Sequence, residues 1–210
     1  MKNILLLTGI VGLFLVSCSN GSQKLIVYSN NGAAIDEASK VITVKDTFGH
    51  NDKEINFSGG NKKTLTVKLS SGDQNIDIDG AGYFIVNAKA RDTIIGGFQK
   101  YSTVQEANRV MTQEELAHNI DSLKQMMTGA NTNVANKTFF ILPYTAAKIT
   151  DNTDAFIVGP YHRMTSIEKV GDKDPEVYRF YSVREVRETI DKLEKLTGAK
   201  PAEDSTGKKK

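Results

Sequence analysis

The sequence of 210 residues contains no tryptophan, a single cysteine and three histidines. One cysteine cannot form a disulfide within the chain, and it cannot supply the cysteine cluster of a structural zinc site. The absence of tryptophan removes a common platform for stacking against sugars and leaves that role to tyrosine and phenylalanine. An excess of one charge is lacking too, because 27 basic residues stand against 25 acidic ones. A nucleic-acid partner, which needs a clustered basic face, is therefore not expected.

Sequence motifs that carry common enzyme chemistry are also missing. No Gly-x-Ser-x-Gly sequence is present to supply an activated serine, and no Gly-x(4)-Gly-Lys-Ser/Thr sequence is present to bind phosphates. The glycines Gly80 and Gly82 lack the third glycine of a dinucleotide-binding turn. The sequence therefore predicts a protein without catalytic residues and without a cofactor.

The first seventeen residues have the anatomy of a signal peptide. A short positive segment that includes Lys2 precedes an apolar stretch over residues 4–16, and the small residue Ser17 follows. This stretch is shorter than the roughly 20 apolar residues that a membrane-spanning helix needs. Residues 1–17 are therefore expected to be cleaved and to take no part in the fold, and no second long apolar run follows them.

The sequence Leu15-Val16-Ser17-Cys18 ends this stretch and resembles the lipobox of bacterial lipoproteins. In that family a diacylglyceryl group is attached to the cysteine thiol, the signal peptide is cut before the cysteine, and the new amine is acylated, for example by palmitate. The resemblance covers residues 1–18 and implies that Cys18 is the lipid anchor of the mature chain. Each buried methylene contributes about 0.8 kcal/mol, so two or three acyl chains on one cysteine hold a protein at the membrane essentially permanently. No free thiol then remains for catalysis.

The residues after Cys18 indicate which membrane carries the protein and on which side of it the protein is held. In lipoproteins of many double-membraned bacteria an aspartate next to the cysteine retains the protein at the inner membrane, and here that position is Ser19. Residues 19–23 contain no acidic run of the kind that some phyla use for surface export. The resemblance thus implies an outer-membrane lipoprotein on the periplasmic side, and an anchored protein with a short tether is expected to have other envelope proteins as partners. Residues 18–23 form a tether of less than about 20 Å, which keeps the folded part close to the bilayer.

Residues 24–101 are rich in strand patterns. The clearest lies at residues 64–69, where apolar residues alternate with threonine and lysine. A turn at residues 70–73 and a second alternating run at residues 76–79 predict a β-hairpin. Further strands are expected at residues 25–28, 41–45, 54–57, 83–88 and 93–98. Short strands between Gly, Asn and Asp turns indicate an antiparallel β-sandwich over residues 24–101.

The apolar period changes to that of a helix within residues 102–199, which we expect to form a mixed strand and helix portion, so the fold class is α+β. Ser/Thr-x-x-Glu capping boxes that begin at Thr112 and Ser182 predict helix starts. Two amphipathic helical stretches are expected, the first being one kinked helix or two helices from Thr103 onward. Residues 200–210 end in three lysines and are expected to be a disordered basic tail. Strands are expected at residues 138–142, 155–158, 164–169 and 177–181.

The strongest candidate site is the segment that contains Tyr161, His162 and Arg163. A turn that carries an aromatic ring, an imidazole and a guanidinium can bind an anion or a peptide carboxylate. The alternative is an ordinary surface turn. His50 lies in a loop, and His118 lies on a helix away from its apolar stripe. No histidine has a partner at metal-ligating spacing, so no metal site is expected.

Two further features have a structural explanation that we favour over a functional one. Asp77 and Asp79 lie on one face of a strand, where paired carboxylates could bind Ca²⁺, but the spacing of an EF-hand is absent. A solvated strand face is therefore expected. Met111, Met126 and Met127 lie in a helical stretch and could form an adaptable partner-binding face. We expect this stripe to face the core.

Three functions are compatible with the sequence. The first, which the anchor, the short tether and the missing catalytic motifs favour, is a non-enzymatic structural or binding component of an envelope assembly, such as a secretion system. The second is a ligand-binding module for a peptide, glycan or anion, centred on residues 161–163. The third is a periplasmic hydrolase, which needs His162 or His50 within hydrogen-bond reach of a carboxylate and a hydroxyl.

Overall fold

The computed structural model describes residues 21–45, 48–100, 112–130, 132–164, 167 and 173–197. Within these ranges it contains twelve strands and two α-helices, so the protein is α+β, as the sequence predicts. The predictions for Cys18, for a helix start at Thr103 and for the tail lie outside the described residues, as does most of the strand expected at 164–169. No helix in the described ranges is both long and apolar enough to cross a membrane.

The strands form three sheets of four strands each. The outer sheet has the order β2 (Ala34–Asp36), β3 (Val41–Thr43), β5 (Lys63–Lys68), β6 (Gln74–Ile78). The central sheet has the order β10 (Thr145–Thr150), β7 (Gly82–Asn87), β1 (Gln23–Ser29), β4 (Asn51–Phe57). The helix-side sheet has the order β11 (Phe156–Val158), β12 (Val177–Ser182), β8 (Ile94–Gln99), β9 (Thr138–Ile141). The helical elements are η1 (Val134–Asn136), α2 (Gln113–Met127) and α3 (Val183–Thr197).

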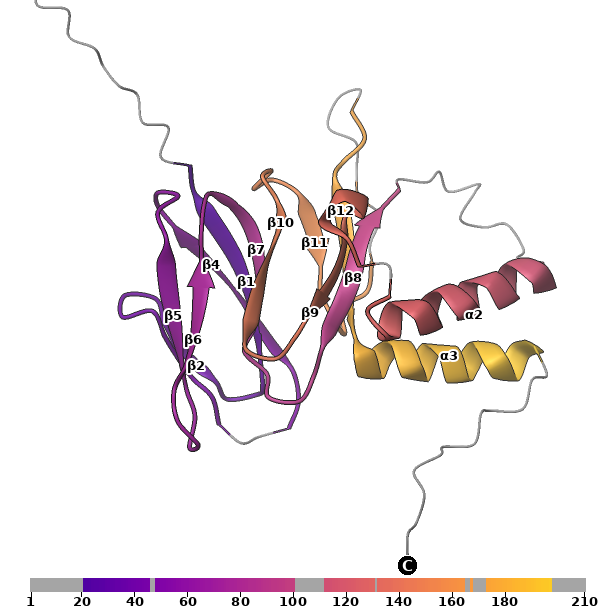
Figure 1. Cartoon of the computed structure of the whole chain (residues 1–210), viewed down its shortest axis with the longest axis horizontal. Helices are drawn as coiled ribbons and strands as arrows, with labels where there is room; N and C mark the ends of the chain where they lie inside the picture. The colour runs from indigo at the N-terminus through magenta and orange to yellow at the C-terminus, as the bar shows by residue number, and fades with distance from the viewer. Residues whose placement is uncertain are drawn as a thin grey trace, which may run out of the picture.

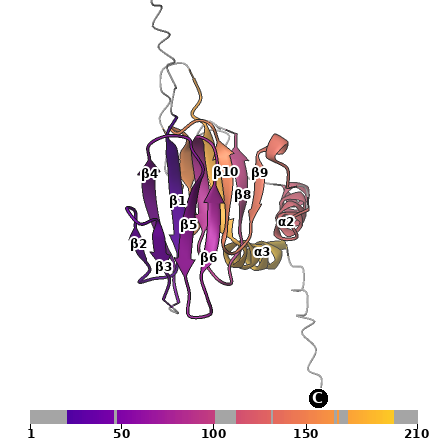
Figure 2. The ribbon, with the colours of Figure 1, turned by 60° about the vertical axis from the view of Figure 1, so that its left-hand side comes forward.

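The three sheets are stacked, and the two helices cover the free face of the helix-side sheet (Figures 1 and 2). Strand β1 shows how the central sheet is packed. Its residues Leu25 and Val27 join the core shared with the outer sheet, whereas Ile26 and Tyr28 join the core shared with the helix-side sheet. Because the central sheet is covered on both faces, all six residues of β7 are buried. This explains why β1 and β7 are continuous apolar runs in the sequence and do not alternate.

The helices begin where their capping boxes predict. The N–H of Glu115 donates to Thr112 Oγ1 at 3.2 Å, and the N–H of Thr112 donates to Glu115 Oε2 at 2.9 Å. The same reciprocal pair starts α3, where Ser182 and Glu185 are joined at 2.9 and 3.1 Å. Both helices pack against β8 through a third cluster of apolar side chains. Met126 and Met127, the described members of the methionine stripe, belong to this cluster and therefore face the core, as expected.

The predicted hairpin is confirmed, because β5 and β6 pair in antiparallel register. The separate antiparallel sandwich over residues 24–101 is not confirmed, for two reasons. First, β10 completes the central sheet and β8 belongs to the helix-side sheet, so two sheets take strands from both sides of residue 101. Second, the sheets are mixed, since β1 with β7, β3 with β5, and β11 with β12 pair in parallel.

One carboxylate joins the central sheet to the helix-side sheet. Glu176, just before β12, accepts hydrogen bonds at Oε1 from the Tyr178 hydroxyl at 2.7 Å, from Lys137 Nζ at 3.1 Å and from Thr150 Oγ1 at 3.1 Å. Its Oε2 accepts from Asn152 Nδ2 at 3.0 Å. Burial opposes ionisation of this group, but the four hydrogen bonds outweigh it and hold the pKa of Glu176 below its usual 4.5.

Candidate functional site

The candidate site lies where the central sheet meets the loop that follows β11. His50 comes just before β4 and Asp52 lies within it, two positions apart, so both side chains project from the same face of the strand. Tyr28 on β1 is the cross-strand partner of Asp52. His162 arrives from the loop after β11, 110 positions along the chain from Asp52.

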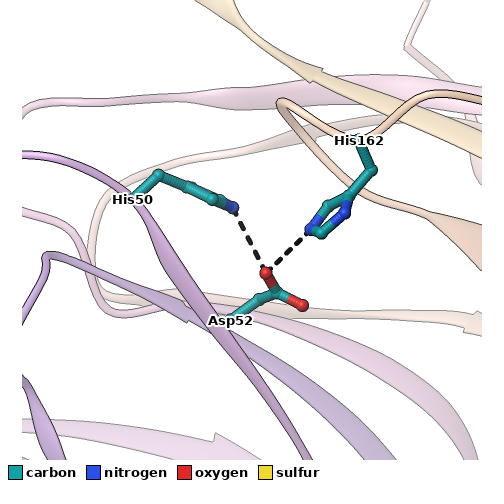
Figure 3. A group of neighbouring side chains, drawn as sticks. All are labelled: His50, Asp52 and His162. Atoms are coloured by element: carbon teal, nitrogen blue, oxygen red, sulfur yellow. Dashed lines mark hydrogen bonds and ion pairs between the residues drawn. The ribbon is translucent and has the colours of Figure 1, made fainter.

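Two imidazoles converge on one carboxylate oxygen (Figure 3). His162 Nε2 is hydrogen-bonded to Asp52 Oδ1 at 2.8 Å. His50 Nε2 lies 3.6 Å from the same oxygen, which is too far for a hydrogen bond. The three potential ligand atoms, one from each residue, all lie within 4.8 Å of one another.

His50 is enclosed by aromatic rings. It stacks on Tyr28 with a centroid distance of 5.5 Å, and the ring of Tyr161 lies 4.9 Å away on a tilted plane. Burial, aided by the positive charge of Lys89 and opposed by the attraction of Asp52, lowers the pKa of His50 to about 4. The imidazole is therefore neutral near pH 7. Neither of its ring nitrogens has a hydrogen-bond partner in the part of the chain that the structure describes.

The loop that carries His162 is fixed by the start of α3 and by β12. Tyr161 adopts a left-handed backbone conformation with φ of 64°, and its N–H donates to Glu185 Oε1 at 2.7 Å. The hydroxyl of Tyr161 is hydrogen-bonded to Ser182 Oγ at 2.9 Å. Arg179 Nη1 donates to the carbonyl of Gly159 at 2.7 Å. The two residues of the α3 capping box thus also hold the loop of the site.

A pocket of about 260 Å³ opens beside the cluster. Its walls combine Tyr28 and three aliphatic side chains with a polar group formed by Asp52, His162 and Arg163. Arg163 is exposed and forms no hydrogen bond or ion pair with another described residue, so its guanidinium is available to a ligand. Gly159 also lines the pocket, and a Cβ at this position would collide with the hydroxyl of Tyr28, so the close approach of the loop to β1 requires glycine.

The structure places the sequence-predicted residues in different roles. His162 and Arg163 line the pocket, whereas Tyr161 packs behind it against His50. His118 is exposed on α2, outside the cluster. Asp77 accepts from Thr64 Oγ1 and pairs with Lys62 Nζ, each at 2.7 Å, on an exposed strand face, as expected for a solvated surface.

Sequence reasoning missed the contribution of His50 and Asp52. The signal that could have found them is the His-x-Asp spacing at a strand start, which places an imidazole and a carboxylate on one face. Nothing in the sequence indicates that His162 meets them. Together the three side chains offer two imidazole nitrogens and a carboxylate oxygen, which can bind a cation.

The hydrolase hypothesis needed an imidazole near both a carboxylate and a hydroxyl. The carboxylate is present at Asp52, but within the described ranges neither His50 nor His162 is hydrogen-bonded to a hydroxyl group. No protein-family model matches the chain, and neither a curated protein nor a solved structure shows significant similarity to it.

Proposed function

We propose that this chain is a lipid-anchored binding protein of the bacterial outer membrane, facing the periplasm and acting as a non-enzymatic component of an envelope assembly. The signal-peptide pattern and the lipobox ending at Cys18 support the anchoring. The pocket at His162 and Arg163 supports the binding role, because it combines an apolar wall with an exposed guanidinium and an imidazole in one concave site.

The chemistry of the pocket favours the anionic end of a ligand. Arg163 can form paired hydrogen bonds to a carboxylate or phosphate, and His162 supplies a second donor when protonated. A volume of about 260 Å³ is below the roughly 300–1,000 Å³ of pockets that enclose drug-sized molecules. The pocket therefore accommodates a small anion or the terminal carboxylate of a peptide or acidic glycan, and the rest of such a ligand stays outside.

Nuclear magnetic resonance can test this role on the full-length protein in detergent micelles. The probes are acetate, inorganic phosphate, glucuronate, and a short peptide with a free C-terminus compared with the same peptide amidated. We expect a saturable shift of the His162 ring protons with at least one anion, and a weaker response to the amidated peptide. Arg163→Ala should weaken binding at least tenfold. Arg184→Ala is the matched control, because Arg184 is exposed and pairs with Glu188 outside the pocket.

Two results would overturn the binding role. One is the failure of every anion to shift the His162 signals in the wild-type protein. The other is an Arg163→Ala variant that binds as tightly as the wild type while remaining folded.

The anchor is tested separately in the native host. Cys18→Ala should abolish acylation, leave the signal peptide misprocessed and reduce membrane association, as read by fractionation and intact mass. Ser19→Ala, the matched control, should keep the lipid and the membrane location. If Cys18→Ala still fractionates with membranes at the processed mass, the anchoring proposal is wrong.

A further inference from the structure

We propose that His50, Asp52 and His162 bind a divalent transition-metal ion, and that a ligand in the adjoining pocket completes the coordination of that ion. The metal site stands on its own observations, whereas the ligand that completes its coordination rests on the binding role proposed above. The first occupant of the site would be a metal cation, held by His50 and Asp52 as well as by the His162 singled out from the sequence.

The donor geometry is close to that of a bound metal. Zinc ligands at bond lengths of about 2.0–2.2 Å in a tetrahedral arrangement place neighbouring donor atoms about 3.4 Å apart. The two separations from Asp52 Oδ1, 2.8 Å to His162 Nε2 and 3.6 Å to His50 Nε2, lie on either side of this value, and all three donor atoms lie within 4.8 Å of one another. His162 has half of its side chain exposed, 52%, on a loop, so a small movement of this residue completes the arrangement.

The buried nitrogens of His50 provide an independent observation. Buried polar atoms almost always have a hydrogen-bond partner, and an exception needs an explanation such as a bound ion. Neither ring nitrogen of His50 has such a partner in the described ranges, although Nε2 faces the Asp52 carboxylate. A cation between Nε2 and Oδ1 would give the nitrogen a partner and balance the charge of the carboxylate.

The supports of the three side chains hold them in place before any metal arrives. His50 is stacked against Tyr28, which orients its ring in place of the hydrogen bond that a metal-bound histidine usually makes through its other nitrogen. The loop of His162 is held by the capping box of α3 through Tyr161. Lys89, whose positive charge acts on His50, is paired with Asp92 at 3.4 Å, which offsets its repulsion of a cation.

Two imidazoles and one carboxylate select for particular metals. Imidazole donors suit zinc, copper, nickel and iron, whereas calcium and magnesium prefer all-oxygen sites with more ligands. Three protein ligands leave at least one coordination position for water or substrate. Asp52, His162 and Arg163 line the same pocket, so an anion there can contact the metal and the Arg163 guanidinium together.

Zinc binding can be measured directly on the full-length protein in detergent micelles. The protein is purified with a tag that contains no histidine, stripped with a chelator, and titrated with Zn²⁺ in competition with a chromophoric chelator. We expect one Zn²⁺ per chain, and no competition from millimolar Ca²⁺ or Mg²⁺. His162→Ala and Asp52→Asn should each lower the association constant at least tenfold. His118→Ala is the matched control, because it removes an exposed histidine outside the cluster and should change nothing.

The outcomes separate this inference from the broader binding role. Absence of stoichiometric Zn²⁺ binding, or equal loss in the His118→Ala and His162→Ala variants, overturns the metal site. In that case an anion that still shifts the His162 signals leaves the binding role standing. If Zn²⁺ binds as expected but no anion binds with or without it, the metal site stands and the anion-binding role is wrong. An anion that binds only after Zn²⁺ supports the shared site.

Discussion

Replacing Glu176 with glutamine removes the negative charge from the group that joins the central sheet to the helix-side sheet, and it does so with almost no change in volume. In the wild type, Oε1 accepts three hydrogen bonds and Oε2 accepts one from Asn152 Nδ2. In the variant the amide group of glutamine would face the amide group of Asn152. Asn152 cannot rotate freely to offer its oxygen, because Oδ1 already accepts from the N–H of Asp154 at 2.9 Å.

The expected loss in the free energy of unfolding at pH 7 is about 2 kcal/mol. Hydrogen bonds to a charged group contribute about 1.5–3 kcal/mol each and neutral ones about 0.5–1.5 kcal/mol. The variant weakens three such bonds and loses one, but the Glu176 side chain is 22% exposed, so water replaces part of the loss. For a domain of this size the melting temperature should fall by about 4–8 °C.

The pH dependence of this difference gives a sharper test. The folded state holds the pKa of Glu176 below its usual 4.5, so its stabilising contribution is fully present above about pH 4.5 and is lost as the pH falls further. Glutamine does not titrate. The gap in stability between the wild type and the variant should therefore narrow as the pH is lowered from 7 to 3.

Urea unfolding followed by circular dichroism measures this gap, because the chain has no tryptophan to report by fluorescence. Glu188→Gln serves as the control, since Glu188 is exposed and pairs only with Arg184 in the described structure, and it should leave stability nearly unchanged. A gap below about 0.5 kcal/mol at pH 7, or one that widens in acid, would refute the role given to Glu176.

Three further substitutions test the packing, each by thermal and urea unfolding. Gly96→Ala places a Cβ against the carbonyl oxygen of Arg179 and 2.7 Å from the Cα of Phe180. It should lower the free energy of unfolding by at least about 3 kcal/mol, and an unchanged stability would contradict the close pairing of β8 with β12. Ile85→Ala leaves a cavity between the central and helix-side sheets and should cost about 2–5 kcal/mol, so a loss below 1 kcal/mol would count against a central sheet covered on that face. Thr112→Ala removes the N-cap of α2 and should cost about 1 kcal/mol, with no loss expected if the cap did not form.

Features that depend on neighbouring residues could be predicted from the sequence. The β5–β6 hairpin follows from alternation on each side of a short turn, and both helix starts follow from reciprocal side-chain and backbone hydrogen bonds three residues apart. The interactions behind these patterns join residues that are close together in the sequence. The methionines of α2 face the core for the same reason, since helical spacing fixes which side chains share a face.

Features that depend on distant partners could not be predicted in this way. Strand β10 was missed because Ala146 and Ala147 are small, and its place is set by pairing with β7 rather than by its own apolar residues. The strand order of the central sheet rests on the parallel pair of β1 with β7, which are far apart in the sequence. The candidate site has the same origin, since His162 meets His50 and Asp52 only because the loop after β11 folds back over β1.

The position of β1 has a mechanical consequence. A pull on the chain just before Gln23 acts along a strand that is paired with β4 on one side and β7 on the other. Such a load shears both hydrogen-bond ladders at once instead of opening them one bond at a time. The Gln23 side chain adds two hydrogen bonds at the start of β1, donating to the carbonyls of Gly80 and Asn61 at 2.7 and 3.1 Å. A force applied through an N-terminal tether would therefore act on a strand that is hydrogen-bonded along both edges, which resists its removal from the sheet.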